Sequence, residues 1–470
     1  MSQEREPLVQ RALAAAADLA RTYLDGLDER PVGAREDGAS IHHRLAGPMP
    51  DAGRDPVAVI RELAAAVDPG LVASGGPRYF GFVIGGQLPA AAGADWLTTA
   101  WNQNAALHAL SPGAAGVEQV AGEWMLELLA LPREASFGFP TGAGLGNAVG
   151  LAAARHAVLA RAGWDVEARG LYGAPQIHVV IGAEAHATAL TALQYLGLGR
   201  ERVIAIEADE QGRMRADRLA EALASLDGPL IVCAQAGNVN TGAFDPIGSI
   251  ADTLAGYPNA WLHVDGAFGL WAATVPRLRH LVAGVDRADS WSTDAHKWLN
   301  VGYDCGFVAV RDPAAHRAAM SATAAYLMQG TGRDGWDYVL DSSRRARGFV
   351  VWAALRSLGR DGVCALVERC CDLASRIADR LRVAGGVEIL NEVALNQVLV
   401  RFTPRDGGDA DAFTREVVAR VQADGTAWMG STTWHGRAAM RISVSNWSTT
   451  EADADRTAEA ILRAVSQGGN

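Results

Sequence analysis

The stretch SWSTDAHKWL, residues 290–299, decides the predicted fold together with HVDGAFG, residues 263–269, just upstream. Asp265 closes an apolar run that begins at Ala260, and such a run predicts a buried strand of a parallel sheet. A carboxylate at the end of a buried strand is costly unless it binds something. Because ligands of open α/β sheets sit at the carboxyl ends of strands, we expect Asp265 to face a ligand site.

Lys297 follows this strand-end aspartate, and on its own it would be interpreted as a solvated surface residue. The pair has a more specific meaning, because pyridoxal 5′-phosphate (PLP) enzymes need both groups. The lysine forms a Schiff base with the cofactor aldehyde, and the aspartate keeps the pyridine nitrogen protonated. Asp265 and Lys297 therefore predict a PLP site.

The composition of the 470 residues is that of an ordinary globular protein, with 49% hydrophobic and 20% charged residues. The net charge of −11 argues against a nucleic-acid or anionic-membrane surface. No apolar stretch reaches transmembrane length, and the start, MSQEREP, lacks the features of a signal peptide. The five cysteines show no metal-ligand spacing. We therefore expect a reduced, cytoplasmic protein with no metal, nucleic-acid partner or membrane partner.

The order of the predicted elements indicates an α/β fold. Helices are predicted at 7–27 and 57–67, with a loop at 31–55 between them. Strands separated mostly by helices predict a largely parallel sheet, and they lie at 176–181, 202–206, 230–235, 261–264 and 307–310. A smaller α+β domain follows, with helices at 347–358 and 363–383 and strands at 396–402 and 440–444. The predicted division is 1–76, 77–345 and 346–470.

Four further groups have chemistry that would suit such a site, and each also has a simpler explanation. The run FPTGAGLGN, residues 139–147, can present backbone amides to a phosphate at the start of a helix, or can be a flexible turn. His186 can stack on a cofactor ring, or be a satisfied polar residue at a strand end. Asp245 precedes a proline, as turn residues do. Tyr326 lies in an Ala- and Gly-rich stretch and can be a plain surface residue.

These motifs, in this order, resemble the group II PLP-dependent amino-acid decarboxylases. This family has fold type I, like aspartate aminotransferase, and includes aromatic-L-amino-acid, histidine, glutamate and diaminobutyrate decarboxylases. The resemblance covers nearly the whole chain. Its other segments are RPV at 30–32, PRYFGF at 77–82, ALSP at 109–112, SRRARG at 343–348 and RISVSNWSTTEAD at 441–453.

The resemblance implies a role for each matching position. Lys297 matches the Schiff-base lysine, Asp265 the pyridinium partner and His186 the ring-stacking histidine. Tyr326 matches the tyrosine of a mobile catalytic loop that reaches the neighbouring subunit's active site. The remaining matches are cofactor contacts at Ala143, Gly144, Ala267, Ser292 and His296, and substrate-pocket positions at Phe82, Val83, Ile84 and Gly85. The resemblance also implies a homodimer with shared active sites, across which the segment 1–76 packs.

Some positions depart from the family pattern. Gly144 stands where many relatives have a hydroxyl residue, and Asn238 replaces a common threonine. The run from Val83 to Gly85 differs from the aromatic, Pro and Thr pattern of animal aromatic decarboxylases. The resemblance therefore implies decarboxylation more strongly than it implies a particular substrate.

We expect an L-amino acid to be converted to its amine and CO2. An aromatic or bulky apolar side chain is predicted, because Phe82, Val83 and Ile84 offer no cation. Three alternatives stay open at the level of sequence: oxidative deamination to an aldehyde, an acidic or diamino substrate, and a catalytically silent homologue. Retention of His186 and Tyr326 favours the amine as product.

Overall fold

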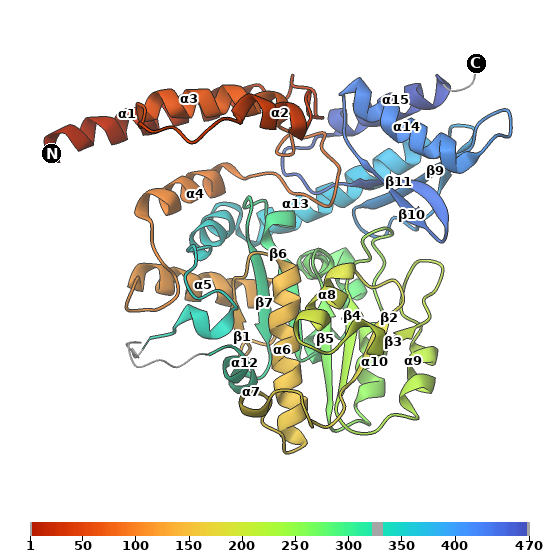
Figure 1. Cartoon of the computed structure of the whole chain (residues 1–470). Helices are drawn as coiled ribbons and strands as arrows, with labels where there is room; N and C mark the ends of the chain where they lie inside the picture. The colour runs from red at the N-terminus through yellow and green to blue at the C-terminus, as the bar shows by residue number, and fades with distance from the viewer. Residues whose placement is uncertain (1, 322–331, 468–470) are drawn as a thin grey trace.

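The computed structural model describes residues 2–321 and 332–467 (Figure 1). Two sheets organise these residues, a seven-stranded one from the middle of the chain and a four-stranded one from its C-terminal part. Figure 1 shows the large sheet and its helices in the lower half and the small sheet with α14 and α15 above them. The predicted fold class, a mostly parallel α/β sheet with a smaller C-terminal α+β domain, is confirmed.

The large sheet has the strand order β1-β7-β6-β5-β4-β2-β3. Strands β2 to β6 run parallel, and β7 is antiparallel to both of its neighbours. The strands are β1 (Ser136–Gly138), β2 (His178–Gly182), β3 (Ile204–Ile206), β4 (Leu230–Gln235), β5 (Ala260–Asp265), β6 (Ser290–Asp294) and β7 (Gly306–Val310). Five of these overlap the predicted strands, whereas β1 and β6 were not predicted. Asp265 ends β5, as expected.

Helix α6 (Ala143–Arg161) positions the site, because it packs along β5, β6 and β7 (Figure 1). Its alanines have high helix propensity and small volume, so the helix lies close to the sheet. The other helices of this part are α4 (Pro89–Trp101), α5 (Pro112–Leu128), α7 (Val166–Arg169), α8 (Ala187–Tyr195), α9 (Ala216–Leu223), α10 (Ile247–Leu254), α11 (Ala295–Trp298) and α12 (Pro313–Met320). Short 3-10 helices occur at Asp68–Gly70, Arg200–Arg202, Gly269–Thr274, Pro276–Val282, Val285–Arg287 and Gly335–Tyr338.

Three helices form the N-terminal part. They are α1 (Ser2–Asp25), α2 (Gly38–Leu45) and α3 (Pro56–Val67), and α1 packs along α3. The expectation of a loop throughout 31–55 is wrong at α2. That helix begins where Asp37 accepts a hydrogen bond from the Ser40 amide, and it buries none of its residues. A helix without a buried face leaves no apolar period in the sequence.

The C-terminal part begins with α13 (Gly348–Arg382), which breaks at Gly359, where φ is 63°. This break separates the two predicted helices. The rest comprises β8 (Val387–Ile389), β9 (Gln397–Phe402), α14 (Ala410–Asp424), β10 (Gly430–Trp434), β11 (Arg437–Ser443) and α15 (Glu451–Ser466). The antiparallel sheet has the order β10-β11-β9-β8. A buried ion pair between Arg78 and Asp453, 3.0 Å long, joins α15 to the segment before α4.

Within the described residues, no helix is both long and apolar enough to cross a membrane. Over the same residues, no group of three potential metal-ligating side chains is present.

Candidate active site

A cavity of about 110 Å³ lies at the carboxyl ends of β4 and β5, facing the amino end of α6. It brings together six residues that the sequence assigned to the site: Ala143, Gly144, His186, Asp265, Ala267 and Lys297. Its other lining residues are Thr188, Gln235, Gly237, Val239, Phe268 and Asp294. The placement agrees with the rule that ligands bind where parallel strands end.

Lys297 lies on α11, the short helix that follows β6. Its Nζ is 3.0 Å from Oδ2 of Asp294 and 5.8 Å from the centre of the Phe268 ring. Lys297 is also the only lysine of the chain, since the other 41 of its 42 Lys and Arg residues are arginines. The chain therefore has a single side-chain amine that can form a Schiff base.

Asp265 is 6% exposed, and both of its carboxylate oxygens have donors. Oδ2 accepts a 2.9 Å hydrogen bond from Nδ2 of Asn147, and Oδ1 accepts a 3.2 Å bond from the amide of Ala267. The carboxylate is therefore held in one orientation at the cavity wall. Asn147 was not among the predicted residues.

His186 caps the amino end of α8. Its Nδ1 is 2.8 Å from Oγ1 of Thr188, and its own amide donates to Oε1 of Gln235 over 3.0 Å. The ring is open to solvent on one side and closely surrounded on the other. That partial burial is the main cause that lowers the pKa of His186, with the Lys297 charge acting in the same direction and the Asp265 charge opposing it. The imidazole is consequently neutral at neutral pH.

Asp294 is a site residue that was not predicted, although it belongs to the motif SWSTDAHKWL at 290–299. Its Oδ2 forms the ion pair with Lys297, and its Oδ1 accepts a 2.6 Å hydrogen bond from the Ala143 amide. Asp294 thus connects the lysine to the start of α6. In this structure the Ala143 amide, one of the predicted phosphate donors, serves that carboxylate.

Two predicted phosphate contacts do not line the cavity. Ser292 is fully buried on β6, and its hydroxyl donates to Oδ1 of Asn147. The His296 ring packs against Tyr303 with 4.4 Å between ring centres, and its Nδ1 accepts from the Cys305 amide over 3.4 Å. Their roles as phosphate ligands stay predictions.

The predicted substrate loop passes directly over Lys297. A Cβ atom added at Gly85 would lie 1.9 Å from the Lys297 carbonyl oxygen, so only glycine fits there. Phe82 and Val83 adopt left-handed φ angles of 53° and 58°, which are uncommon outside glycine. Val83 is buried, and Ser445 donates its hydroxyl hydrogen to the Ile84 carbonyl over 3.0 Å. These four residues flank the cavity without lining it. Tyr326 lies outside the described residues.

Arg441 on β11 is a second missed residue, though it opens the RISVSNW motif. Burial is the main cause that lowers the pKa of its guanidinium, and its charge acts on both Tyr79 and His186. Among the described residues, no carboxylate lies within 4.0 Å of it. A half-buried cation whose charge acts on His186, with no carboxylate of the described residues within 4.0 Å, suits a carboxylate ligand.

Asp245 is a fully buried residue rather than only a turn residue. Its carboxylate accepts hydrogen bonds of 2.7 Å from the amides of Met214 and Gln235. Burial raises the pKa of Asp245 to about 6. It therefore braces the end of β4, where the Gln235 side chain holds His186.

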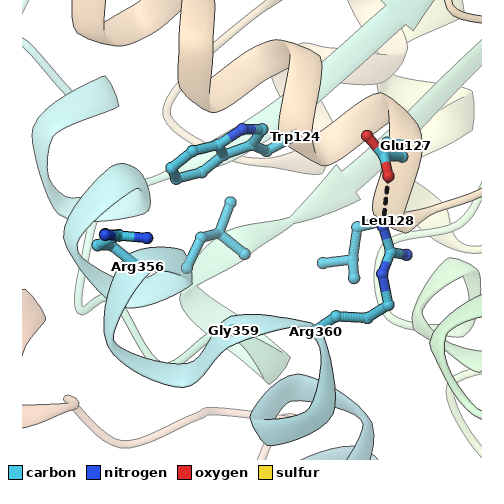
Figure 2. Close-up of a pocket in the computed structure, with 7 residues that line it drawn as sticks. Trp124, Glu127, Leu128, Arg356, Gly359 and Arg360 are labelled. Carbon is cyan, nitrogen blue, oxygen red and sulfur yellow. Dashed lines mark hydrogen bonds and ion pairs between the residues drawn. The ribbon is translucent and has the colours of Figure 1, made fainter.

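A second cavity lies between α5 and α13, away from these groups (Figure 2). Its polar side includes the ion pair between Arg360 and Glu127, 2.5 Å long. Its lining includes no lysine, histidine or cysteine. The full set is Trp124, Glu127, Leu128, Leu355, Arg356, Gly359 and Arg360.

The donor set of the first cavity fits PLP. Lys297 would hold the aldehyde, Asp265 would meet the pyridine nitrogen, and His186 and Ala267 would lie on either face of the ring. The amino end of α6 at Gly144 would receive the phosphate, because helix amino ends attract anions. A Cβ added at Gly144 would find no atom closer than 3.5 Å, so there is room at this end.

A mostly parallel α/β sheet with a strand-end carboxylate and a cavity lysine defines the class of fold-type I PLP enzymes. The chain belongs to the pyridoxal-dependent decarboxylase family, whose conserved domain matches residues 43–403. The predicted activity, PLP-dependent decarboxylation of an amino acid, is thereby confirmed, and so are the cofactor and the resemblance stated from the sequence.

Relatives in several organisms share this family. Tryptophan decarboxylase 1 of Oryza sativa is 29% identical, over 93% of this chain and 90% of the relative. An acidic amino acid decarboxylase of Homo sapiens is 30% identical, over 76% and 69%. Among solved structures, Oryza sativa TDC with PLP and tryptamine matches with a TM-score of 0.91 and 25% identity, covering 98% of each chain.

Proposed function

We propose that this decarboxylase acts on an L-amino acid with an aromatic or other bulky apolar side chain and releases the amine and CO2. The observation that carries the proposal is a stack of aromatic rings beside the loop over Lys297. The Tyr79 and Trp428 rings are 5.1 Å apart at 10°, and Phe82 stacks on Trp428 at 5.7 Å. Such faces favour an aromatic side chain. The similarity to a tryptophan decarboxylase supports the same choice.

The cations around the site also favour an apolar side chain. Arg441 can bind the α-carboxylate that every amino acid carries. An acidic side chain would need a second cation, and the sequence offered Arg344 and Arg345 as candidates. Arg344 forms a 2.5 Å ion pair with Glu118, and Arg345 a 2.6 Å pair with Asp95. Neither is therefore free to neutralise a substrate carboxylate.

PLP, when bound, supplies an electron sink for the pair of electrons that the departing CO2 leaves behind. The residues of the chain prepare that event. Lys297 would hold the cofactor aldehyde, and Asp265 would keep the pyridine nitrogen protonated through a charge-assisted hydrogen bond of about 1.5–3 kcal/mol. Arg441 fixes the α-carboxylate, and His186 covers the ring. We assign proton delivery to Cα to Tyr326.

We further propose a homodimer with shared active sites, in which the segment 1–76 packs across the partner and the loop bearing Tyr326 reaches the other site. Large apolar side chains exposed on α1, on α3 and on the neighbouring α4 support this, because a monomer would leave them in water. They are Leu8, Val9, Leu13, Val59, Leu63, Trp96, Leu97 and Trp101.

Two coarser assignments accompany these. We propose a cytoplasmic location, supported by five cysteines that are all free thiols. We also propose the division into segments 1–76, 77–345 and 346–470. The strands of the large sheet fall within the second segment and those of the small sheet within the third.

The test is a screen of L-amino acids with the purified protein and saturating PLP, in which released CO2 is measured and the organic product is identified. We expect turnover of tryptophan, tyrosine or phenylalanine, with the amine as product. Turnover of glutamate, aspartate or diaminobutyrate without any aromatic substrate would refute the proposed specificity. An aldehyde accompanied by peroxide would point to oxidative deamination instead.

A further inference from the structure

Buried polar side chains form a continuous series of hydrogen bonds that ends on Asp265. It begins at Trp261 on β5, whose Nε1 donates to Oγ of Ser290 over 2.9 Å. Ser290 is 2.8 Å from Nδ1 of His263, and Nε2 of His263 is 3.0 Å from Oδ1 of Asn147. Nδ2 of Asn147 then donates to Asp265. All five residues are more than nine-tenths buried.

The donor roles in this series are fixed by chemistry. The indole N–H of Trp261 can only donate, and an ionised carboxylate can only accept, so Asn147 must turn its NH2 group to Asp265 and its carbonyl to His263. Burial lowers the pKa of His263 to about 4, with the nearby Asp265 charge opposing that shift. The ring therefore carries one N–H at neutral pH, and that hydrogen is on Nε2. Every bond of the series consequently donates toward Asp265.

Helix α6 is shaped around these contacts. Asn147 is the only polar side chain among the buried residues of this helix. A Cβ added at Gly150 would lie 2.9 Å from the His263 ring, and one added at Gly146 would lie 3.0 Å from Cβ of Ser292. Each glycine costs about 1 kcal/mol of helix propensity relative to alanine. The sequence thus retains two unfavourable residues that let the polar groups of β5 and β6 reach the helix.

We propose that Asn147 is a positioning residue: it holds the Asp265 carboxylate in the orientation that meets the pyridine nitrogen, and His263 in turn fixes the orientation of the Asn147 amide. The inference rests on the proposed role of Asp265. A network that only satisfied buried polar groups would have no effect on the cofactor. A positioning network has such an effect, because the rotation of the terminal carboxylate depends on its donor.

The experiment compares Asn147→Thr with Asn147→Val. The two side chains have the same shape and a similar helix propensity, and only threonine keeps a hydroxyl donor. PLP dissociation constants and the pH dependence of the visible absorption band are measured without any amino acid. Asn396→Thr and Asn396→Val form the matched control, because Asn396 is equally buried but donates to the Val444 carbonyl in the small domain.

We expect Asn147→Val to bind PLP at least about tenfold more weakly than Asn147→Thr. Affinity falls by about this factor when a residue that orients a ligand-binding side chain loses its hydrogen bond. Its absorption band should also titrate at a different pH from that of the wild type. The pair at position 396 should bind PLP equally. Equal PLP affinity and equal pH dependence in folded Thr and Val variants at position 147 would overturn the proposal.

If neither variant folds, the PLP dissociation constant of Asn147→Asp is measured instead. This substitution keeps the side-chain shape but replaces the donor that faces Asp265 with an oxygen. Weakened PLP binding in this folded variant would support the proposal, and wild-type PLP affinity would refute it. Because no substrate enters these measurements, a wrong substrate prediction shows itself separately, as wild-type protein that binds PLP normally but does not decarboxylate aromatic amino acids.

Discussion

Lys297 is predicted to be the residue to which PLP is covalently attached. Lys297→Ala should abolish the visible absorption of the PLP-loaded protein, because the chain then has no side-chain amine. Arg54→Lys is the matched control, since it adds an amine on the exposed surface. That variant should keep one reducible cofactor linkage per chain, located at Lys297. Covalent retention of PLP by Lys297→Ala would show that the linkage was assigned to the wrong group.

The buried ring of His316 should make the free energy of unfolding depend on pH. Burial lowers the pKa of this histidine to about 3, and its ring lies between Ser136 and the Tyr338 carbonyl. The pKa of a histidine in the unfolded chain is about 6.5. Above that pH neither state binds the proton. Between about 6.5 and 3 only the unfolded state does, so stability is lost as the pH falls.

His316→Gln removes this contribution. The melting temperature of the wild type minus that of the variant should stay constant above about pH 7 and should decrease as the pH falls toward 4. Thermal unfolding of both proteins across this range measures the difference. A difference that does not change with pH would mean that His316 takes up its proton equally in the folded and unfolded states.

Tyr326 is predicted to determine the product. Tyr326→Phe keeps the ring but removes the proton that we assign to Cα, so amine formation should slow, with each tenfold loss equal to about 1.4 kcal/mol of barrier. Aldehyde and peroxide should then increase. Amine release at the wild-type rate, measured with saturating PLP and substrate, would remove Tyr326 from the mechanism.

At the scale of the element, α5 offers a test of packing against helix propensity. A Cβ added at Gly122 would lie 1.9 Å from the Phe137 ring of β1, whereas one added at Gly116 in the same helix would meet nothing within 4 Å. Gly122→Ala should therefore destabilise the protein by about 1–3 kcal/mol through overpacking. Gly116→Ala should stabilise it by about 0.5–1 kcal/mol. Urea unfolding distinguishes them, and equal effects of both variants would contradict the packing.

The elements that could be predicted are those whose burial is apolar. Strand β4 has the sequence LIVCAQ and was predicted with its correct ends. Strand β6 has the sequence SWSTD and was missed as a strand, although all five of its residues are buried. Its serines satisfy their hydroxyls with Asn147 and His263, and these partners come from other elements. A sequence pattern cannot show such long-range satisfaction.

The residues of the candidate site also fall into those that could be predicted from the sequence and those that could not. Asp265 and His186 could be predicted because each follows a predicted strand, and Lys297 because it follows Asp265 along the chain in a motif of known chemistry. Asn147 could not, because it looks like an interruption in an alanine-rich helix. Asp294 and Arg441 were passed over because a charged residue reveals its partner, or its lack of one, only in three dimensions.

At the scale of the whole molecule, the proposed dimer predicts complementation between two inactive variants. Lys297→Ala and Tyr326→Phe protomers should each have little activity. In mixed dimers, one site combines an intact lysine with an intact tyrosine from the other chain, so activity should reappear. The measurement needs subunit exchange proven by differently tagged chains. Proven exchange without recovered activity would mean that Tyr326 serves its own subunit.

Because Lys297 is the only lysine, its reaction with amine-directed reagents can be followed without interference from other lysines. Acylating reagents directed at amines find one side-chain target in the chain, and PLP competes with them for it. The fraction of chains in which Lys297 escapes acylation therefore equals the fraction of occupied sites, and it is measured without a spectrum or a substrate. For the same reason, attachment of a side chain to an amine-reactive surface would occur only at vacant sites, so immobilisation through exposed carboxylates is the chemistry that preserves function.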